Sequence, residues 1–188
     1  MTRREAISRV SLLLGGVIIG ADAFLTGCKP SSKTIFEFTD KDIALLNEIA
    51  DTILPATSTP GAKDANVAPF MVTMVKDCYK EKDQEILAAG LAKIQEAADN
   101  KYNKDFMQLS AEQRTVLLTE IDVEQQKYTN NKKEDDAPHY FRMYKELTLL
   151  AYFTSEKGAS QALSYIAVPG KFEAITEYKK GQRAWALN

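Results

Sequence analysis

Apolar residues recur at intervals of three and four positions along most of this chain, and that spacing is the feature that most limits its fold. The clearest case is a segment expected to form a helix from about Asp83 to Tyr102. Its apolar positions are Ile86, Leu87, Leu91, Ile94 and Ala98. A spacing near 3.6 residues places such side chains on one face of an α-helix. No stretch of convincing length alternates apolar and polar residues as a half-buried strand does. We therefore expect an all-α fold, an irregular bundle of about five or six helices with long Pro/Gly-rich loops.

Capping residues mark where the first helices of this bundle begin and end. Thr39, with acidic Asp40 and Asp42 after it, is expected to cap a first helix that Pro55 ends. The apolar positions of that helix are Ile43, Leu46, Ile49 and Ile53. A loop rich in Pro, Thr, Ser and Gly follows, and Pro69 is expected to open a second helix through Phe70, Met74, Val75 and Cys78.

Helix starts and loops can also be placed in the second half of the chain. Ser110 and Gln113 form a capping box in front of a fourth helix, whose buried residues are expected to be Leu117, Leu118 and Ile121. The polar stretch 129–138 is expected to be an exposed loop. A long apolar and aromatic helix then begins near His139, and a short helix is expected over residues 160–166.

The N-terminus carries two adjacent arginines, Arg3 and Arg4, in front of an apolar run over residues 10–25. This run is shorter than the roughly 20 apolar residues that cross a bilayer as a helix. It therefore fits an export signal better than a permanent anchor. The arginine pair agrees with a twin-arginine signal, whereas Ala6 and Ser8 depart from that pattern, so the general secretory route stays open as the alternative.

Directly after the apolar run stands Leu-Thr-Gly-Cys, which ends at Cys28 and resembles the lipobox of bacterial lipoproteins. We expect residues 1–27 to be removed as a signal peptide and Cys28 to be lipidated. Residues 28–37, which are polar around Pro30, are expected to tether the lipid to a helical domain over residues 38–188. These expectations place the protein outside the cytoplasm, lipid-anchored to the bacterial cell envelope and facing the periplasm.

Processing would leave a chain of 161 residues with a formal charge of −3, enough for one domain with a sizeable core. Nothing in it resembles the basic footprint of a nucleic-acid-binding protein. With Cys28 acylated, Cys78 has no partner for a disulfide, and we expect it to be buried on a helix face.

Few residues of the chain stand in patterns typical of catalytic or metal-binding sites. His139 is the one histidine, at a position typical of helix starts rather than of metal ligands. Glycine-rich phosphate loops, haem attachment motifs and nucleophile elbows are missing from the sequence. Glu48 and Asp51 are expected to lie on a solvated helix face. We therefore expect neither a catalytic residue nor a metal site.

Two stretches of the chain carry a distinctive combination of motifs. They are LLNEIADTILPATSTPGAKDANVAPFM, residues 45–71, and YFTSEKGASQALSYIAVPGKFEAITEY, residues 152–178, with RAWAL shortly after. Together they resemble the paired motifs of the gluconate 2-dehydrogenase subunit 3 family. The resemblance extends from about Phe38 to Leu187. Its diagnostic pieces are the Ile-Ala-Asp and Thr-Pro-Gly-Ala elements of the first stretch and the Ser-Glu-x-Gly and Val-Pro-Gly elements of the second.

This resemblance implies a non-catalytic partner of a large FAD-binding dehydrogenase subunit of the glucose-methanol-choline type, which oxidises a sugar, polyol or sugar acid. It also implies that electrons pass to a cytochrome c subunit and that the small subunit carries the export signal for both chains. The lipobox is a departure from many relatives and suggests an added anchoring role. The positions that the resemblance marks as structural or interface residues are Asp51, Pro55, Thr59, Pro60, Gly61, Glu156, Gly158, Pro169, Gly170 and Trp185.

Aromatic residues crowd the last third of the chain. They are Tyr152, Phe153, Tyr165, Phe172, Tyr178 and Trp185. Aromatic side chains are common both at the centres of interfaces and in cores, so both placements stay open. Besides an accessory subunit, two other functions remain: a stand-alone lipoprotein that binds a ligand or a surface partner, and an enzyme whose site the sequence does not reveal.

Overall fold

The computed structural model describes residues 37–168, 170, 171, 175 and 177–186. The chain divides into two units, Met1–Thr34 and Ile35–Asn188, and all described residues lie in the second. Arg3, Arg4, Cys28, Pro169 and Phe172 lie outside the described residues, so the export signal and the lipidation site have no structural account.

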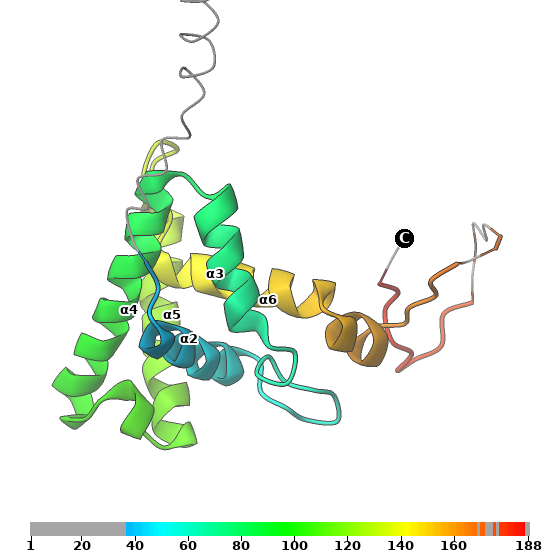
Figure 1. The fold of residues 1–188 in the computed structure, drawn as a ribbon, viewed down its shortest axis with the longest axis horizontal. Helices are drawn as coiled ribbons and strands as arrows, with labels where there is room; N and C mark the ends of the chain where they lie inside the picture. Colours follow the sequence, from blue (N-terminus) through cyan, green and yellow to red (C-terminus); the bar gives the residue numbers. More distant parts are fainter. Residues whose placement is uncertain (1–36, 169, 172–174, 176, 187–188) are drawn as a thin grey trace, which may run out of the picture. The chain divides into compact units, whose positions relative to one another are not determined.

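Five α-helices make up most of the described chain (Figure 1). They are α2 (Asp40–Ile53), α3 (Val67–Cys78), α4 (Glu81–Tyr102), α5 (Ala111–Asn131) and α6 (Tyr140–Thr154). A 3-10 turn, η1 (Phe106–Gln108), precedes α5, and a short π-helix, η2 (Gly158–Ala162), follows α6. Within the described ranges no strand forms, and Ser164 and Trp185 make an isolated bridge. The expected all-α fold is confirmed.

Both predicted capping boxes are present. The Asp42 amide donates to Thr39 Oγ1 at 3.3 Å, and the Thr39 amide donates to Asp42 Oδ2 at 2.8 Å. Ser110 and Gln113 make the same reciprocal pair at the start of α5. These bonds satisfy amides that have no partner inside the first helical turn, so short-range sequence signals set both starts correctly.

The predicted start of α3 is wrong. The helix begins at Val67, after Asn66 in the left-handed region at φ 54°. Pro69 is tolerated as the third helical residue because amides of the first turn have no acceptor within the helix. The buried face consists of Val67, Ala68, Met71 and Val75, while Phe70 and Cys78 are exposed. The expectation of a buried Cys78 is wrong, because the face of α3 that packs on the core is the one that carries Met71 and Val75.

Helix α6 is the centre of the bundle. It contacts α2, α3, α4 and α5 as well as η2. Its buried residues are Tyr140, Phe141, Met143, Tyr144, Leu147, Thr148, Ala151 and Tyr152. The most aromatic segment of the sequence is thus the helix around which the others pack, and it holds η2 at its carboxyl end.

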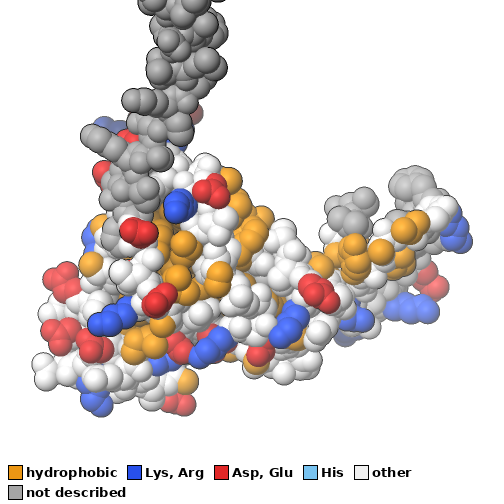
Figure 2. All heavy atoms as spheres, in the orientation of Figure 1, with side chains coloured by type: hydrophobic (Ala, Val, Ile, Leu, Met, Phe, Trp, Pro, Cys, Tyr) orange, Lys and Arg blue, Asp and Glu red, His pale blue; other side chains and the backbone are white. Residues whose placement is uncertain are grey.

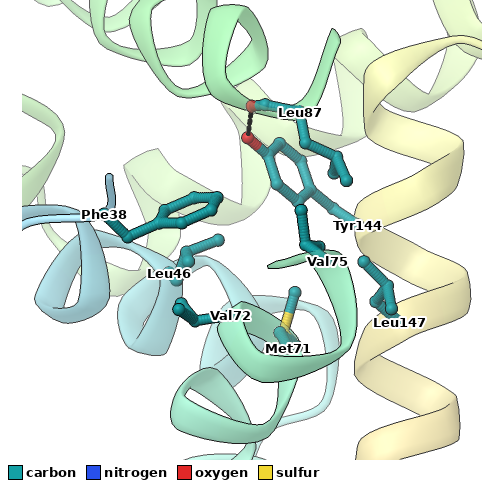
Figure 3. A pocket seen from close by; sticks show the side chains of 8 residues that line it. All are labelled: Phe38, Leu46, Met71, Val72, Val75, Leu87, Tyr144 and Leu147. Carbon is teal, nitrogen blue, oxygen red and sulfur yellow. Dashed lines mark hydrogen bonds between the residues drawn. The ribbon is translucent and has the colours of Figure 1, made fainter. Parts of the chain in front are cut away.

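A small apolar cavity lies where α2, α3, α4 and α6 meet (Figure 3). Its volume is about 10 Å³, and Met71, Leu87 and Leu147 are among the residues that line it. The Tyr144 side chain lies against it and donates from its hydroxyl to the Leu87 carbonyl. A void of this size holds at most about one water molecule, so it is a packing defect and not a ligand site.

Candidate functional site

Two segments that are far apart in the sequence meet beside the carboxyl end of α6. The first is the loop over residues 54–66 between α2 and α3, and the second is the turn over residues 152–163. The Tyr152 hydroxyl donates to the Pro60 carbonyl at 2.5 Å, and Lys157 Nζ donates to the Asp64 carbonyl at 2.7 Å. We call these two segments together the motif junction, since they hold six of the ten positions that the family resemblance marks.

The loop of the motif junction is tightly wound around Gly61. The Gly61 amide donates to Asp64 Oδ2 at 2.9 Å, and the Ala62 amide donates to the Leu54 carbonyl at 2.9 Å. A Cβ atom on Gly61 would lie 2.5 Å from the Ala56 backbone nitrogen. Because no real Cβ approaches backbone this closely, the loop closes only with glycine at this position.

The turn of the motif junction also depends on a glycine. A Cβ atom on Gly158 would lie 1.9 Å from the Tyr152 carbonyl oxygen. Ser155 Oγ accepts from the Gly158 amide at 3.0 Å and donates to the Tyr152 carbonyl at 2.6 Å. This close approach lies at the start of η2. The short helix expected over residues 160–166 is present, but as a π-helix over Gly158–Ala162, so its predicted bounds are wrong.

A charged cluster fixes the other side of the loop. Glu48, on α2, pairs with Lys63 of the loop and with Arg114 of α5. Arg114 also donates to the carbonyls of Phe106 at 3.2 Å and Met107 at 2.8 Å. The Glu48 side chain is only 16% exposed, so the expectation that it lies on a solvated face is wrong.

The electrostatics of this cluster favour the charged form of Glu48. Burial by itself raises the pKa of its carboxyl group, but the hydrogen bond from Lys63 and the positive charge of Arg114 outweigh that effect and lower the pKa. The ionised carboxylate therefore ties α2 and α5 to the loop at neutral pH.

A known protein family matches the part of the chain that holds the motif junction and the charged cluster. The sequence model described as gluconate 2-dehydrogenase subunit 3 matches residues 40–170, from the first residue of α2 to beyond the turn of the motif junction. The chain belongs to the gluconate 2-dehydrogenase subunit 3 family. Neither the curated proteins nor the solved structures give a significant match.

The motif positions of this subunit 3 chain have different surroundings in the structure. Gly61 and Gly158 are buried, Asp51, Thr59 and Pro60 are half-buried, and Pro55 and Glu156 are exposed. Gly170 is exposed as well and has φ 71°, a left-handed conformation that favours glycine. The structure thus brings Pro60, Gly61 and Gly158 into one junction and leaves Gly170 outside it. The Thr-Pro-Gly-Ala and Ser-Glu-x-Gly elements therefore meet. Pro169 of the Val-Pro-Gly element lies outside the described residues.

His139 is a capping residue, as its position in the sequence suggested. Its Nδ1 accepts from the Phe141 amide at 3.2 Å at the start of α6. Burial lowers the pKa of the imidazole, against the opposing charge of Glu124. Because Nδ1 accepts a hydrogen bond, the neutral ring carries its proton on Nε2. Over the described part of the chain, no group of His, Cys, Asp and Glu side chains could hold a metal ion.

The aromatic residues of the last third divide between core and surface. Tyr152 is buried, whereas Phe153, Tyr165, Tyr178 and Trp185 are all at least two-fifths exposed. Trp185 lies next to the motif junction, because the Ser164 amide donates to the Ala184 carbonyl at 2.7 Å and the Ala186 amide donates to the Ser164 carbonyl at 2.8 Å. The helices that the structure describes include none long and apolar enough to span a bilayer.

Proposed function

We propose that this subunit 3 chain is the non-catalytic small subunit of a membrane-associated, FAD-dependent dehydrogenase of the glucose-methanol-choline type. Its large partner binds FAD and oxidises a sugar or sugar acid, and a cytochrome c subunit receives the electrons. The small chain itself serves in export, stabilisation and membrane anchoring of the flavoprotein. The family description, which names a dehydrogenase subunit, supports this assignment.

The observation that carries the proposal is the motif junction. The segments that characterise the family resemblance form a rigid, hydrogen-bonded corner around Gly61 and Gly158. Two prolines, Pro55 and Pro60, and two tightly packed glycines, Gly61 and Gly158, shape the backbone of this corner. A corner of this kind suits a fixed surface for another subunit, because its backbone loses little freedom on binding.

The N-terminal sequence supports the anchoring and export roles. Lipidation of Cys28 would hold the small subunit at a membrane, and its partner would be held through it. A twin-arginine signal at Arg3 and Arg4 suits a complex that folds around FAD before export, since a single signal on the small chain can serve both proteins.

The proposal is tested by expressing the chain together with its neighbouring genes and isolating it from the membrane fraction. A larger, FAD-containing protein with sugar or sugar-acid dehydrogenase activity is expected to accompany it. Purified alone, the small chain is expected to show no turnover. Isolation of the chain without a flavoprotein, from membranes that still oxidise these sugars, would contradict the proposal and favour a stand-alone lipoprotein.

A further inference from the structure

The chain beyond η2 is extended and carries exposed apolar side chains (Figure 1). We call the described residues 163–168 and 177–186 the C-terminal arm. Five large apolar side chains of the arm are exposed: Tyr165 49%, Ile166 48%, Val168 81%, Tyr178 74% and Trp185 49%. Figure 2 shows hydrophobic side chains gathered along one side of this region and Lys and Arg along the other.

This amount of exposed apolar surface is large for one short segment. A covered aromatic side chain buries about 150–250 Å². The exposed parts of the five side chains therefore offer on the order of 500 Å², more than half of the roughly 800 Å² that each partner contributes to a stable interface. This area is comparable with the largest apolar patch of an ordinary monomer, about 300–600 Å², which is often a functional surface.

The arm has a defined position on the rest of the subunit. Arg183 donates to the carbonyls of Ser160 at 3.2 Å and Gln161 at 2.7 Å, both in η2. The backbone pairing of Ser164 with residues 184 and 186 adds a second attachment. Since η2 belongs to the motif junction, the arm and the junction form one continuous surface.

The charge of the arm is opposite to that of the helical body. Residues 163–188 hold four Lys or Arg and two Glu, whereas residues 37–162 hold 15 Lys or Arg and 22 Asp or Glu. Lys179, Lys180 and Arg183 are all exposed. A complementary surface therefore has apolar pockets surrounded by acidic groups.

We propose that the C-terminal arm docks on such an acidic, apolar-pocketed surface of the large dehydrogenase subunit. This inference rests on the proposed function, in which that subunit exists. A partner protein fits the arm better than an anionic bilayer does, for two reasons. Hydrogen bonds to η2 fix the arm, as a specific interface requires, and the strongly acidic body beside it would be repelled by anionic headgroups.

The test uses the complex that is expected when the chain is expressed together with its neighbouring genes. Two quantities are measured. The first is the amount of FAD-containing protein bound per mole of small chain, determined from the flavin that it releases, and the second is the dissociation constant of the complex. One variant combines Tyr178→Ser with Trp185→Ser, and another combines Lys179→Glu with Lys180→Glu. The matched control combines Val116→Ser with Val123→Ser on α5, where the side chains are 47% and 45% exposed.

Both arm variants are expected to weaken binding of the flavoprotein at least tenfold, since anchor residues at an interface dominate its affinity. The charge variant is also expected to reduce the salt dependence of association. The α5 control is expected to bind as the unaltered chain does. Unchanged urea midpoints would show that the arm variants fold, because the arm contributes no residue to the core.

Two results would overturn the inference, and they can be told apart. If the unaltered chain binds the flavoprotein and both folded arm variants bind it equally well, the docking assignment is wrong while the proposed function stands. If the unaltered chain binds no flavoprotein, both fail. Loss of binding to anionic phosphatidylglycerol vesicles, with flavoprotein binding intact, would instead assign the arm to the membrane.

Discussion

The hydroxyl of Tyr152 donates to the carbonyl of Pro60 at 2.5 Å, and this bond joins two motif segments 92 residues apart in the sequence. Tyr152 belongs to the central helix α6, with its side chain in the core, and Pro60 belongs to the loop before α3. The bond therefore ties the loop to the core helix, in addition to the packing of Ala62 in the core.

Replacing Tyr152 by Phe should destabilise the protein by about 1 kcal/mol, the usual net value of one hydrogen bond. The aromatic ring stays in place, so the loss reports the bond to Pro60 and not the packing. Urea unfolding followed by circular dichroism measures the change. Tyr178→Phe, in which the altered side chain is 74% exposed, is the control and should leave the midpoint unchanged. Equal midpoints for both variants would show that the junction bond contributes nothing.

Replacing Gly158 by Ala should destabilise the protein by about 1–3 kcal/mol, as overpacking of a close contact does. The new methyl group would meet the Tyr152 carbonyl oxygen at 1.9 Å, so the turn has to move away from α6. Gln161→Ala, at an exposed position of the same turn, is the control for a general loss of local structure. Thermal unfolding of both variants gives the comparison, and an unchanged midpoint for Gly158→Ala would contradict the observed approach.

Replacing Glu48 by Gln should cost about 1–3 kcal/mol at neutral pH, because Lys63 and Arg114 lose their shared charged partner. The lowered pKa of Glu48 in the folded state fixes the pH dependence. Its contribution is fully present above the ordinary value of 4.5 and is lost as the pH falls through the lower, folded-state value. The stability difference between the two proteins should therefore shrink in acid.

Urea titrations of the unaltered chain and of Glu48→Gln at a series of pH values measure this difference. Glu85→Gln, at an exposed position on α4, serves as the control and should follow the unaltered chain throughout. A Glu48→Gln effect of the same size at pH 7 and at pH 3 would rule out the charge as its cause.

The parts of this fold that were predictable are those set by residues close together in the sequence. The buried face of α4, with Leu87, Leu91, Ile94 and Ala98, follows from its period, and the caps at Thr39 and Ser110 follow from residues three positions apart. The start of α3 was missed because proline is allowed anywhere in the first turn, and the preference for its first position is only statistical.

The parts that were not predictable depend on long-range contacts. Glu48 was expected on a solvated helix face because its partners Lys63 and Arg114 lie 15 and 66 residues away in the sequence. No local sequence pattern indicates these two ion pairs. The same holds for the motif junction. The sequence singled out Pro60, Gly61 and Gly158 one by one, but only the packing of α6 shows that the segments holding them touch.

Replacing Cys28 by Ala should release the protein from membranes, provided that this residue carries the lipid. Each buried methylene group of an acyl chain contributes about 0.8 kcal/mol to membrane binding, so removing the attachment point removes the main anchor. Fractionation of cells into soluble and membrane parts measures the change. Cys78→Ala is a matched control, since this exposed cysteine is expected to have no role in anchoring. Membrane retention of Cys28→Ala would contradict the lipoprotein assignment.

Replacing Arg3 and Arg4 together by Lys should block export of this chain and of its flavoprotein partner. The substitution keeps both positive charges, so an ordinary secretory signal would continue to function, whereas a twin-arginine signal depends on the arginines themselves. Arg9→Lys, at the third arginine of the same region, is the control and should be exported normally. Immunoblots for both proteins in periplasmic and cytoplasmic fractions measure the outcome. If the small chain is exported while the flavoprotein stays in the cytoplasm, the two proteins do not share one export route. Normal export of both would assign this signal to the general secretory route.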